Sequence, residues 1–190
     1  NDFLGRDYLY SNTGNGAFKE SALQQMNHIS YSSMGVDVAD INNDGWQDLF
    51  VVDMKSSTNL GQKINMSSMN PKAFNVLVKV GGHYQYMRNT LQMNNGNNTF
   101  SDIAPMAGLA STNWSWAPLF VDLDNDGLKD LLVTNGIRKN TNNKDYDNYR
   151  KKRFEEESMK ARPDFPSLVK EILSNIPSEK VVNLVYKNTD

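Results

Sequence analysis

Residues 40–48 read DINNDGWQD, and residues 122–130 read DLDNDGLKD. Both stretches follow the pattern Asp-x-[Asp/Asn]-x-Asp-Gly-x-x-Asp. In such a loop, oxygen-bearing side chains at positions 1, 3 and 5 can converge on one hard cation, while the glycine at position 6 permits a sharp turn. Two loops of this kind in one chain indicate a repeated metal site.

The two loops belong to a longer internal repeat with an offset of 82 residues. Residues 9–52 align with residues 91–134 without a gap, and 14 of these 44 positions are identical. A third copy begins near the end of the sequence, where residues 185–189 (VYKNT) resemble residues 9–13 (LYSNT). Such a repeat indicates one structural unit that is used several times and that stacks on its neighbours.

Each unit has the pattern of four β-strands. Residues 36–40 alternate apolar and acidic side chains, and residues 49–52 form a short apolar run on the far side of the acidic loop. Residues 9–20 place a Thr-Gly-Asn-Gly turn between two strand-like segments, which is typical of a β-hairpin. The unit is therefore expected to be strand, acidic loop, strand and hairpin.

Two insertions interrupt the repeat. Asn70-Pro71 can begin a short helix over residues 72–80, which Gly81-Gly82 would end. Residues 141–178 predict an exposed helix with three pairs of Lys or Arg and Glu four residues apart. The same segment continues with a second expected helix that has an apolar stripe along one face, made of Leu168, Val169, Ile172, Leu173 and Ile176. Because the repeat resumes after each insertion, neither is expected to be a separate domain.

The loops predict two Ca²⁺ ions. Ca²⁺ accepts six to eight oxygen ligands in a flexible shell, whereas Mg²⁺ prefers waters and strict octahedral geometry. Positions 1, 3, 5 and 9 would supply side-chain oxygens and position 7 a backbone carbonyl. The expected ligands are Asp40, Asn42, Asp44, Trp46 and Asp48 in the first loop and Asp122, Asp124, Asp126, Leu128 and Asp130 in the second. Since Asn42 carries no charge, the first loop is expected to bind less tightly.

The same residues allow two other interpretations of the loops to be compared with a calcium site: an EF-hand and a polar turn without metal. An EF-hand requires a bidentate Glu at position 12 and a helix on each side. Position 12 is Val51 in one loop and Val133 in the other, and the flanking segments are strands, which excludes an EF-hand. The loops can also be polar turns that need no metal, although carboxylates packed together without a cation repel one another.

The amino-acid composition excludes several classes of function. The chain has 20 basic and 22 acidic residues and a net charge of -2, so it lacks the basic surface on which nucleic-acid binding depends. No run of 18 apolar residues predicts a membrane span. The absence of cysteine removes disulfides and thiolate chemistry. The sequence opens without Met or a signal peptide, which predicts that it is a piece of a longer protein.

The hairpin pattern Asn-x-Gly-[Asn/Asp]-x-x-Phe, followed by the acidic loop, resembles the FG-GAP/VCBS repeat of integrin-α-type β-propellers. This resemblance implies an all-β fold, a β-propeller of four-stranded blades with helical insertions, of which this chain holds a part. Residues 1–190 would be a fragment of one propeller domain. It would comprise the end of a blade (1–32), a complete blade (33–104, with an insertion at 54–83) and the next blade (115–190, with the helical insertion at 141–178).

Residues 33–40, 114–118 and 176–181 further resemble a narrower group. These are surface lipoproteins of Bacteroidota with ASPIC/UnbV-type repeats, often associated with SusC/SusD-like outer-membrane uptake systems. The resemblance implies an extracellular or cell-surface location, with outer-membrane anchoring through an N-terminal part that precedes this sequence. It also implies a partner, either a glycan or another protein subunit of an outer-membrane assembly.

We expect a binding module and not an enzyme, with two alternatives. Paired carboxylates could make a polysaccharide-active enzyme on the propeller scaffold, but a carboxylate that holds Ca²⁺ is deprotonated and a poor general acid. A purely architectural subunit could clamp a partner with residues 141–178.

Among aromatic residues, Trp46 and Trp114 are candidates for a sugar contact, whereas Trp116 aligns with Met34 and is expected to pack in the core.

Overall fold

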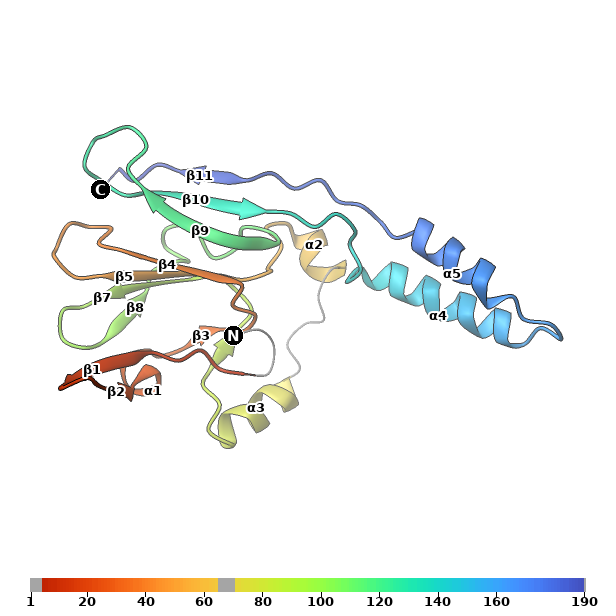
Figure 1. Ribbon diagram of the computed structural model, residues 1–190, viewed down its shortest axis with the longest axis horizontal. Coiled ribbons are helices and arrows are strands. Elements are labelled where there is room, and N and C mark those ends of the chain that lie inside the picture. Colours follow the sequence, from red (N-terminus) through yellow and green to blue (C-terminus); the bar gives the residue numbers. More distant parts are fainter. Residues whose placement is uncertain (1–4, 65–70, 190) are drawn as a thin grey trace.

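The computed structural model describes residues 5–64 and 71–189 (Figure 1). Its strands form four small sheets, and a pair of helices extends away from them on one side. The arrangement is all-β with helical insertions, as the sequence predicts.

The central sheet has four antiparallel strands in the order β4-β5-β7-β8. The first acidic loop joins β4 to β5, and a hairpin turn joins β7 to β8. The expected unit of strand, acidic loop, strand and hairpin is therefore present as one sheet. Its strands are Gly35–Ala39 (β4), Asp48–Val52 (β5), Thr90–Asn94 (β7) and Phe100–Asp102 (β8).

The second copy of the repeat forms a three-stranded sheet in the order β11-β10-β9. The second acidic loop joins β9 to β10, as the first joins β4 to β5. The third copy begins in β11, which pairs with β10 as β7 pairs with β5. These strands are Ser115–Val121 (β9), Asp130–Asn135 (β10) and Leu184–Tyr186 (β11).

The N-terminal segment forms a separate hairpin followed by a helical turn. Its elements are Tyr10–Gly14 (β1), Ala17–Glu20 (β2) and Ala22–Gln25 (α1). Two residues, Ile29–Ser30 (β3), then pair in parallel with Gln85–Tyr86 (β6). This short contact joins the N-terminal segment to the end of the first insertion, and no local sequence pattern predicts it.

The core lies between the central sheet and the three-stranded sheet. Phe50, Val52 and Val133 have no exposed surface there, and Leu91 and Leu131 are almost as buried. Burying one such side chain contributes about 1.5–3 kcal/mol. Apolar packing between consecutive copies of the repeat therefore holds the two sheets together.

The first strands of the two sheets approach closely. The peptide N–H of Phe120 in β9 donates to the carboxylate of Asp37 in β4, at 2.6 Å. A Cβ atom on Gly35 would lie 2.5 Å from the carbonyl oxygen of Trp116, which is closer than real Cβ atoms come to backbone. Glycine is required at position 35 because β9 occupies the space of a side chain.

The first insertion contains the helices α2 (Asn59–Ile64) and α3 (Pro71–Lys79). The predicted helix after Asn70-Pro71 is confirmed, although Asn70 itself lies outside the described residues. Gly81 ends it with φ of 88°, and the peptide N–H of Gly82 donates to the carbonyl of Leu77.

None of the helices in the described part of the chain combines the length and the apolar character needed to cross a membrane.

Residues 141–178 form a helical arm of two helices, α4 (Lys144–Ser158) and α5 (Phe165–Ser174), which projects from the sheets (Figure 1). Leu168 and Ile172 of the predicted apolar stripe pack against Tyr146. Val169 and Leu173 of the same stripe are exposed. Ile176 also packs against this cluster, so three of the five stripe residues hold the arm together and two face solvent.

Ion pairs in the arm differ in part from the expected ones. Lys152 and Glu156 pair four residues apart as predicted, at 3.8 Å. Arg153 does not pair with Glu157; it bridges Glu156 and, on the other helix, Glu171, each at 2.8 Å. Hydrogen bonds from Arg153 lower the pKa of Glu171 to about 2. The charge of Arg153 thus links the two helices of the arm.

Gly35→Ala is expected to destabilise the contact between the two sheets, because the new methyl group overlaps the backbone of Trp116. Overpacking of this kind costs about 1–3 kcal/mol, and each kcal/mol lowers the melting temperature by about 2–4 °C for a chain of this size. Val38→Ala is the control, since the side chain of Val38 in the same strand is 47% exposed. Equal melting temperatures for the two variants would contradict the close approach.

Candidate metal centre

The two acidic loops share one backbone conformation. Asn43 and Asn125, at position 4, have φ of 56° and 60°, and Gly45 and Gly127, at position 6, both have φ of 89°. Asparagine tolerates the left-handed region better than most residues, and glycine adopts it without strain. The Asn and Gly that both loops contain therefore produce the same turn twice.

Peptide N–H groups orient the carboxylates inside each loop. The carboxylate at position 1 accepts the N–H groups of positions 5 and 6, and the carboxylate at position 5 accepts that of position 7. Donor–acceptor distances are 2.8–3.1 Å in both loops. The acceptors are Asp40 and Asp44 in the first loop and Asp122 and Asp126 in the second.

The aspartates at position 9, Asp48 and Asp130, begin β5 and β10 and are buried. One oxygen of Asp48 accepts the N–H of Ile41 in the loop at 3.0 Å, and the other accepts that of Asn94 in β7 at 2.7 Å. Asp130 makes the equivalent two bonds, at 3.1 and 2.9 Å. Burial raises the pKa of Asp48, although the two backbone hydrogen bonds oppose this. Each aspartate fastens its loop to the sheet; metal ligation by the pair stays a prediction.

Three of the ligands predicted for the second loop come together. Asp122, Asp124 and Asp126 each place one carboxylate oxygen within 4.8 Å of the others. Because Ca²⁺–oxygen distances are about 2.3–2.6 Å, two ligands on opposite sides of one ion lie about 5 Å apart. The spacing and the carboxylate chemistry of this cluster therefore fit a calcium ion.

The ammonium group of Lys187, which follows β11, lies on this cluster. It donates to the carboxylate of Asp124 and lies 3.4 Å from Oδ2 of Asp126. Hydrogen bonding to Lys187 lowers the pKa of Asp124, and the same contact raises the pKa of Lys187. A cation that belongs to the chain thus offsets part of the charge of the three carboxylates.

The first loop has an amide where the second has its third carboxylate. Nδ2 of Asn42 donates to Asp44 at 2.9 Å and lies 3.9 Å from the sulfur of Met93. Met93 precedes Asn94 in the third strand of its sheet, as Lys187 precedes the equivalent Asn188. The neighbour of the first loop is therefore a neutral thioether instead of an ammonium group.

Sequence reasoning missed a second repeated feature, an ion pair that closes each hairpin. Arg6 pairs with Glu20 at 3.0 Å, and Arg88 pairs with Asp102 at 2.8 Å. Burial would raise the pKa of Asp102, but hydrogen bonds led by that from His28 outweigh it and lower the pKa. The arginine recurs at the 82-residue offset, and the glutamate recurs as an aspartate. The arginine lies three residues before the aligned segment, so extending the alignment of the repeat toward the N-terminus would have revealed this pattern.

The prediction for Trp116 is wrong. Its side chain is 47% exposed, and its indole N–H donates to the carbonyl of Gly136 at 2.5 Å. Ser115 and Pro118 on either side are buried, and a register shift between β9 and β10 begins at Asn135, so the residue equivalent to Met34 turns outward. Trp114 is half-buried, contrary to expectation.

Trp46 lies at the rim of the first loop, 51% exposed. A Cβ atom on Gly96 would come within 2.8 Å of its indole nitrogen, so the ring covers the hairpin turn between β7 and β8. Trp46 is therefore the tryptophan that lies beside an acidic loop.

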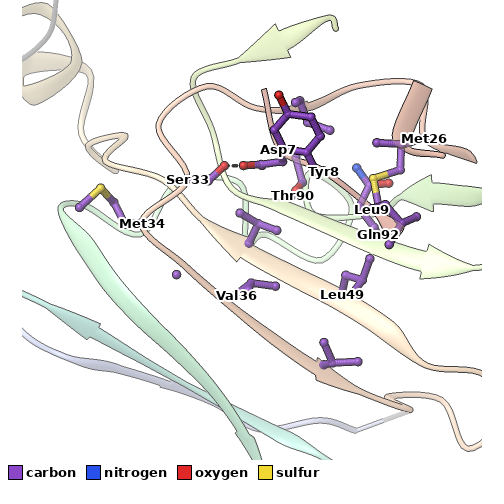
Figure 2. A pocket seen from close by; sticks show the side chains of 15 residues that line it. Asp7, Tyr8, Leu9, Met26, Ser33, Met34, Val36, Leu49, Thr90 and Gln92 are labelled. Atoms are coloured by element: carbon purple, nitrogen blue, oxygen red, sulfur yellow. Dashed lines mark hydrogen bonds between the residues drawn. The ribbon is translucent and has the colours of Figure 1, made fainter. Parts of the chain in front are cut away.

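A cavity of about 610 Å³ separates the other face of the central sheet from the N-terminal segment. Figure 2 shows Val36 and Leu49 of the sheet on one side and Tyr8, Leu9 and Met26 on the other. The lining is mainly apolar, so this cavity offers packing surface and no further group of carboxylates.

The sequence matches the family model of the FG-GAP-like repeat over residues 1–51 and 77–133, more than half of the chain. The chain therefore belongs to the FG-GAP-like repeat family. The two matches end 82 residues apart, which is the offset of the internal repeat. Membership identifies the sheets as parts of a propeller-like interaction module of a kind typical of extracellular and surface proteins. Neither a curated protein nor a solved structure matches the chain.

Asp48→Asn is expected to destabilise the chain in EGTA, because the amide presents N–H to one of the two backbone donors that the carboxylate accepts. An unsatisfied buried donor costs about 1–3 kcal/mol. Asp44→Asn, at an exposed position of the same loop, is the control and is expected to change the free energy of unfolding by about 0.5 kcal/mol or less. Urea unfolding in EGTA measures both, and equal effects would contradict the fastening role of Asp48.

Proposed function

We propose that this chain is a calcium-stabilised interaction module that binds one Ca²⁺ in each acidic loop and has no catalytic activity of its own. The observation that carries the proposal is the convergence of Asp122, Asp124 and Asp126, in a loop whose backbone the first loop repeats. The ligand set is the predicted one, with Asp40, Asn42 and Asp44 in the first loop. The carbonyls of Trp46 and Leu128 and the carboxylates of Asp48 and Asp130 complete the two shells.

Bound calcium would stabilise each turn between the first two strands of a blade. The loop carboxylates repel one another, and a divalent cation removes that repulsion. Affinities of about 10⁻⁴–10⁻³ M are typical of extracellular modules. A site of this affinity fills only where calcium is millimolar, so the proposal requires the extracellular or surface setting that is typical of the family.

The partner in this proposal is another protein subunit of a surface or outer-membrane assembly, or a glycan that such an assembly takes up. Support comes from the family, whose repeats form interaction modules, and from the narrower lipoprotein resemblance. The exposed ring of Trp46 beside the first loop gives a glycan a flat apolar surface on which to stack.

A thermal melt of the chain in EGTA, in millimolar Ca²⁺ and in millimolar Mg²⁺ tests the proposal. Ca²⁺ is expected to raise the melting temperature, because binding only to the folded state adds about 1.4 kcal/mol when its concentration is ten times the Kd. Mg²⁺ is expected to raise it less, since it gives up its waters reluctantly.

Asp44→Ala and Asp126→Ala are each expected to remove part of the calcium shift, and the double variant all of it. Asp145→Ala, at the start of the helical arm and outside both loops, is the matched control and is expected to keep the full shift. A melting temperature that Ca²⁺ leaves unchanged would show that the loops are polar turns and refute the proposal.

The exposed apolar side of α5 favours a second candidate function, an architectural role in which the arm holds a partner. Phe165, Val169 and Leu173 lie four residues apart on α5 and are 43%, 43% and 58% exposed. A stripe at this spacing can dock into an apolar groove of another protein.

Deleting residues 141–178 is expected to release such a partner from the assembly while the melting temperature of the sheets stays the same. The base of the arm allows this, because Asn140 donates to the carbonyl of Pro177 at 2.7 Å and Ile137 pairs with Glu179. A short Gly-Ser linker can therefore join the two ends. Co-purification of the assembly measures the effect, and an assembly that survives the deletion excludes the role.

A further inference from the structure

We infer that the ammonium group of Lys187 competes with Ca²⁺ for the carboxylates of the second acidic loop. This competition equalises the calcium affinities of the two loops. This inference rests on the proposed calcium binding and concerns how that binding is tuned. It cancels the difference expected from sequence, in which the second loop binds more tightly because it has one more carboxylate.

The geometry places the ammonium group where a metal ion would compete with it. Lys187 donates to Asp124 and lies 3.4 Å from Asp126, and both carboxylates belong to the converging cluster. Its backbone position is fixed, because the next residue, Asn188, donates its peptide N–H to the buried Asp130 at 2.9 Å. The ammonium group is thus held beside the loop and needs to move only by rotation of its own side chain.

The charge count at positions 1, 3 and 5 differs between the loops and becomes equal once this neighbour is included. The first loop has two carboxylates and the amide of Asn42, with neutral Met93 at the equivalent strand position. The second has three carboxylates with Lys187 beside them. Counted over positions 1, 3 and 5 and this neighbour, both loops therefore have a charge of -2 before metal binds (-2 in the first, -3 + 1 in the second), and position 9 is aspartate in both. The extra carboxylate and the lysine offset each other.

Calcium must displace the ammonium group from Asp124 and Asp126 before it can use those oxygens. A neighbouring opposite charge at about 4–6 Å changes the proton affinity of a carboxylate by roughly 10- to 1,000-fold. Competition for another cation rests on the same Coulomb interaction, and partial exposure to water favours the low end of that range. We therefore expect an effect of about tenfold on the calcium affinity of the second loop.

Isothermal titration with CaCl₂ in single-site backgrounds tests the inference. With Asp44→Ala removing the first site, Lys187→Met is expected to raise the calcium affinity of the second loop about tenfold. With Asp126→Ala removing the second site, Met93→Lys is expected to lower the affinity of the first loop by a similar factor. Lys187→Met also has a readout without metal, since it should lower the melting temperature in EGTA by exposing the carboxylates to mutual repulsion.

Lys129→Met is the matched control. It removes the same charge from position 8 of the same loop, but Lys129 makes no ion pair with the cluster in the described residues. An increase in affinity as large as that of Lys187→Met would overturn the inference in favour of a general charge effect. An unchanged affinity for Lys187→Met, in a chain whose loops do bind calcium, would overturn the inference and leave the proposed function standing. Absence of binding in every variant would overturn both.

Discussion

Each acidic loop depends on one buried carboxylate that accepts two backbone N–H groups. Asp48 and Asp130 have almost no exposed surface, and burying a charge is costly unless hydrogen bonds replace the lost water. One of the two bonds comes from the loop and the other from the third strand of the sheet. The loop, the strand it leads into and the next strand are therefore fixed together. In the second loop, the converging carboxylates of Asp122, Asp124 and Asp126 thus stand on a backbone segment that Asp130 holds to the sheet.

Local patterns in the sequence were enough to predict the strands of the repeated unit, the acidic loops and the helices α3, α4 and α5. Periodicity identifies a strand, and Asn and Gly at positions 4 and 6 determine a turn, without reference to the rest of the chain. Features that depend on contacts between distant segments could not be predicted in this way. The β3–β6 pair, the outward turn of Trp116 and the partner that Arg153 finds on the second helix of the arm belong to this group.

The same distinction explains why counting carboxylates within a loop misjudges its charge. Position 3 is Asn42 in one loop and Asp124 in the other, and this difference is visible in the aligned loops. A second difference compensates for this one and lies elsewhere in the chain. Met93 in β7 and Lys187 just after β11 occupy equivalent places beside the two loops. Two copies of one repeat thus differ at two positions that are far apart in sequence and meet only in the folded sheet. The electrostatics of a repeat belong to the assembled unit and not to the motif that identifies it.

The topology also separates the acidic loops from the insertions. In an antiparallel sheet, the turn from the first to the second strand lies at one end and the connection from the second to the third lies at the other. The acidic loops occupy the first kind of connection, and both insertions occupy the second. Figure 1 accordingly shows the helical arm projecting from the end opposite the loops. The base of the arm is closed by its own backbone contacts, between Asn140 and Pro177 and between Ile137 and Glu179. The arm and the acidic loops therefore occupy separate connections of the chain, and a change in the length of the arm leaves in place the strand ends that carry the loops.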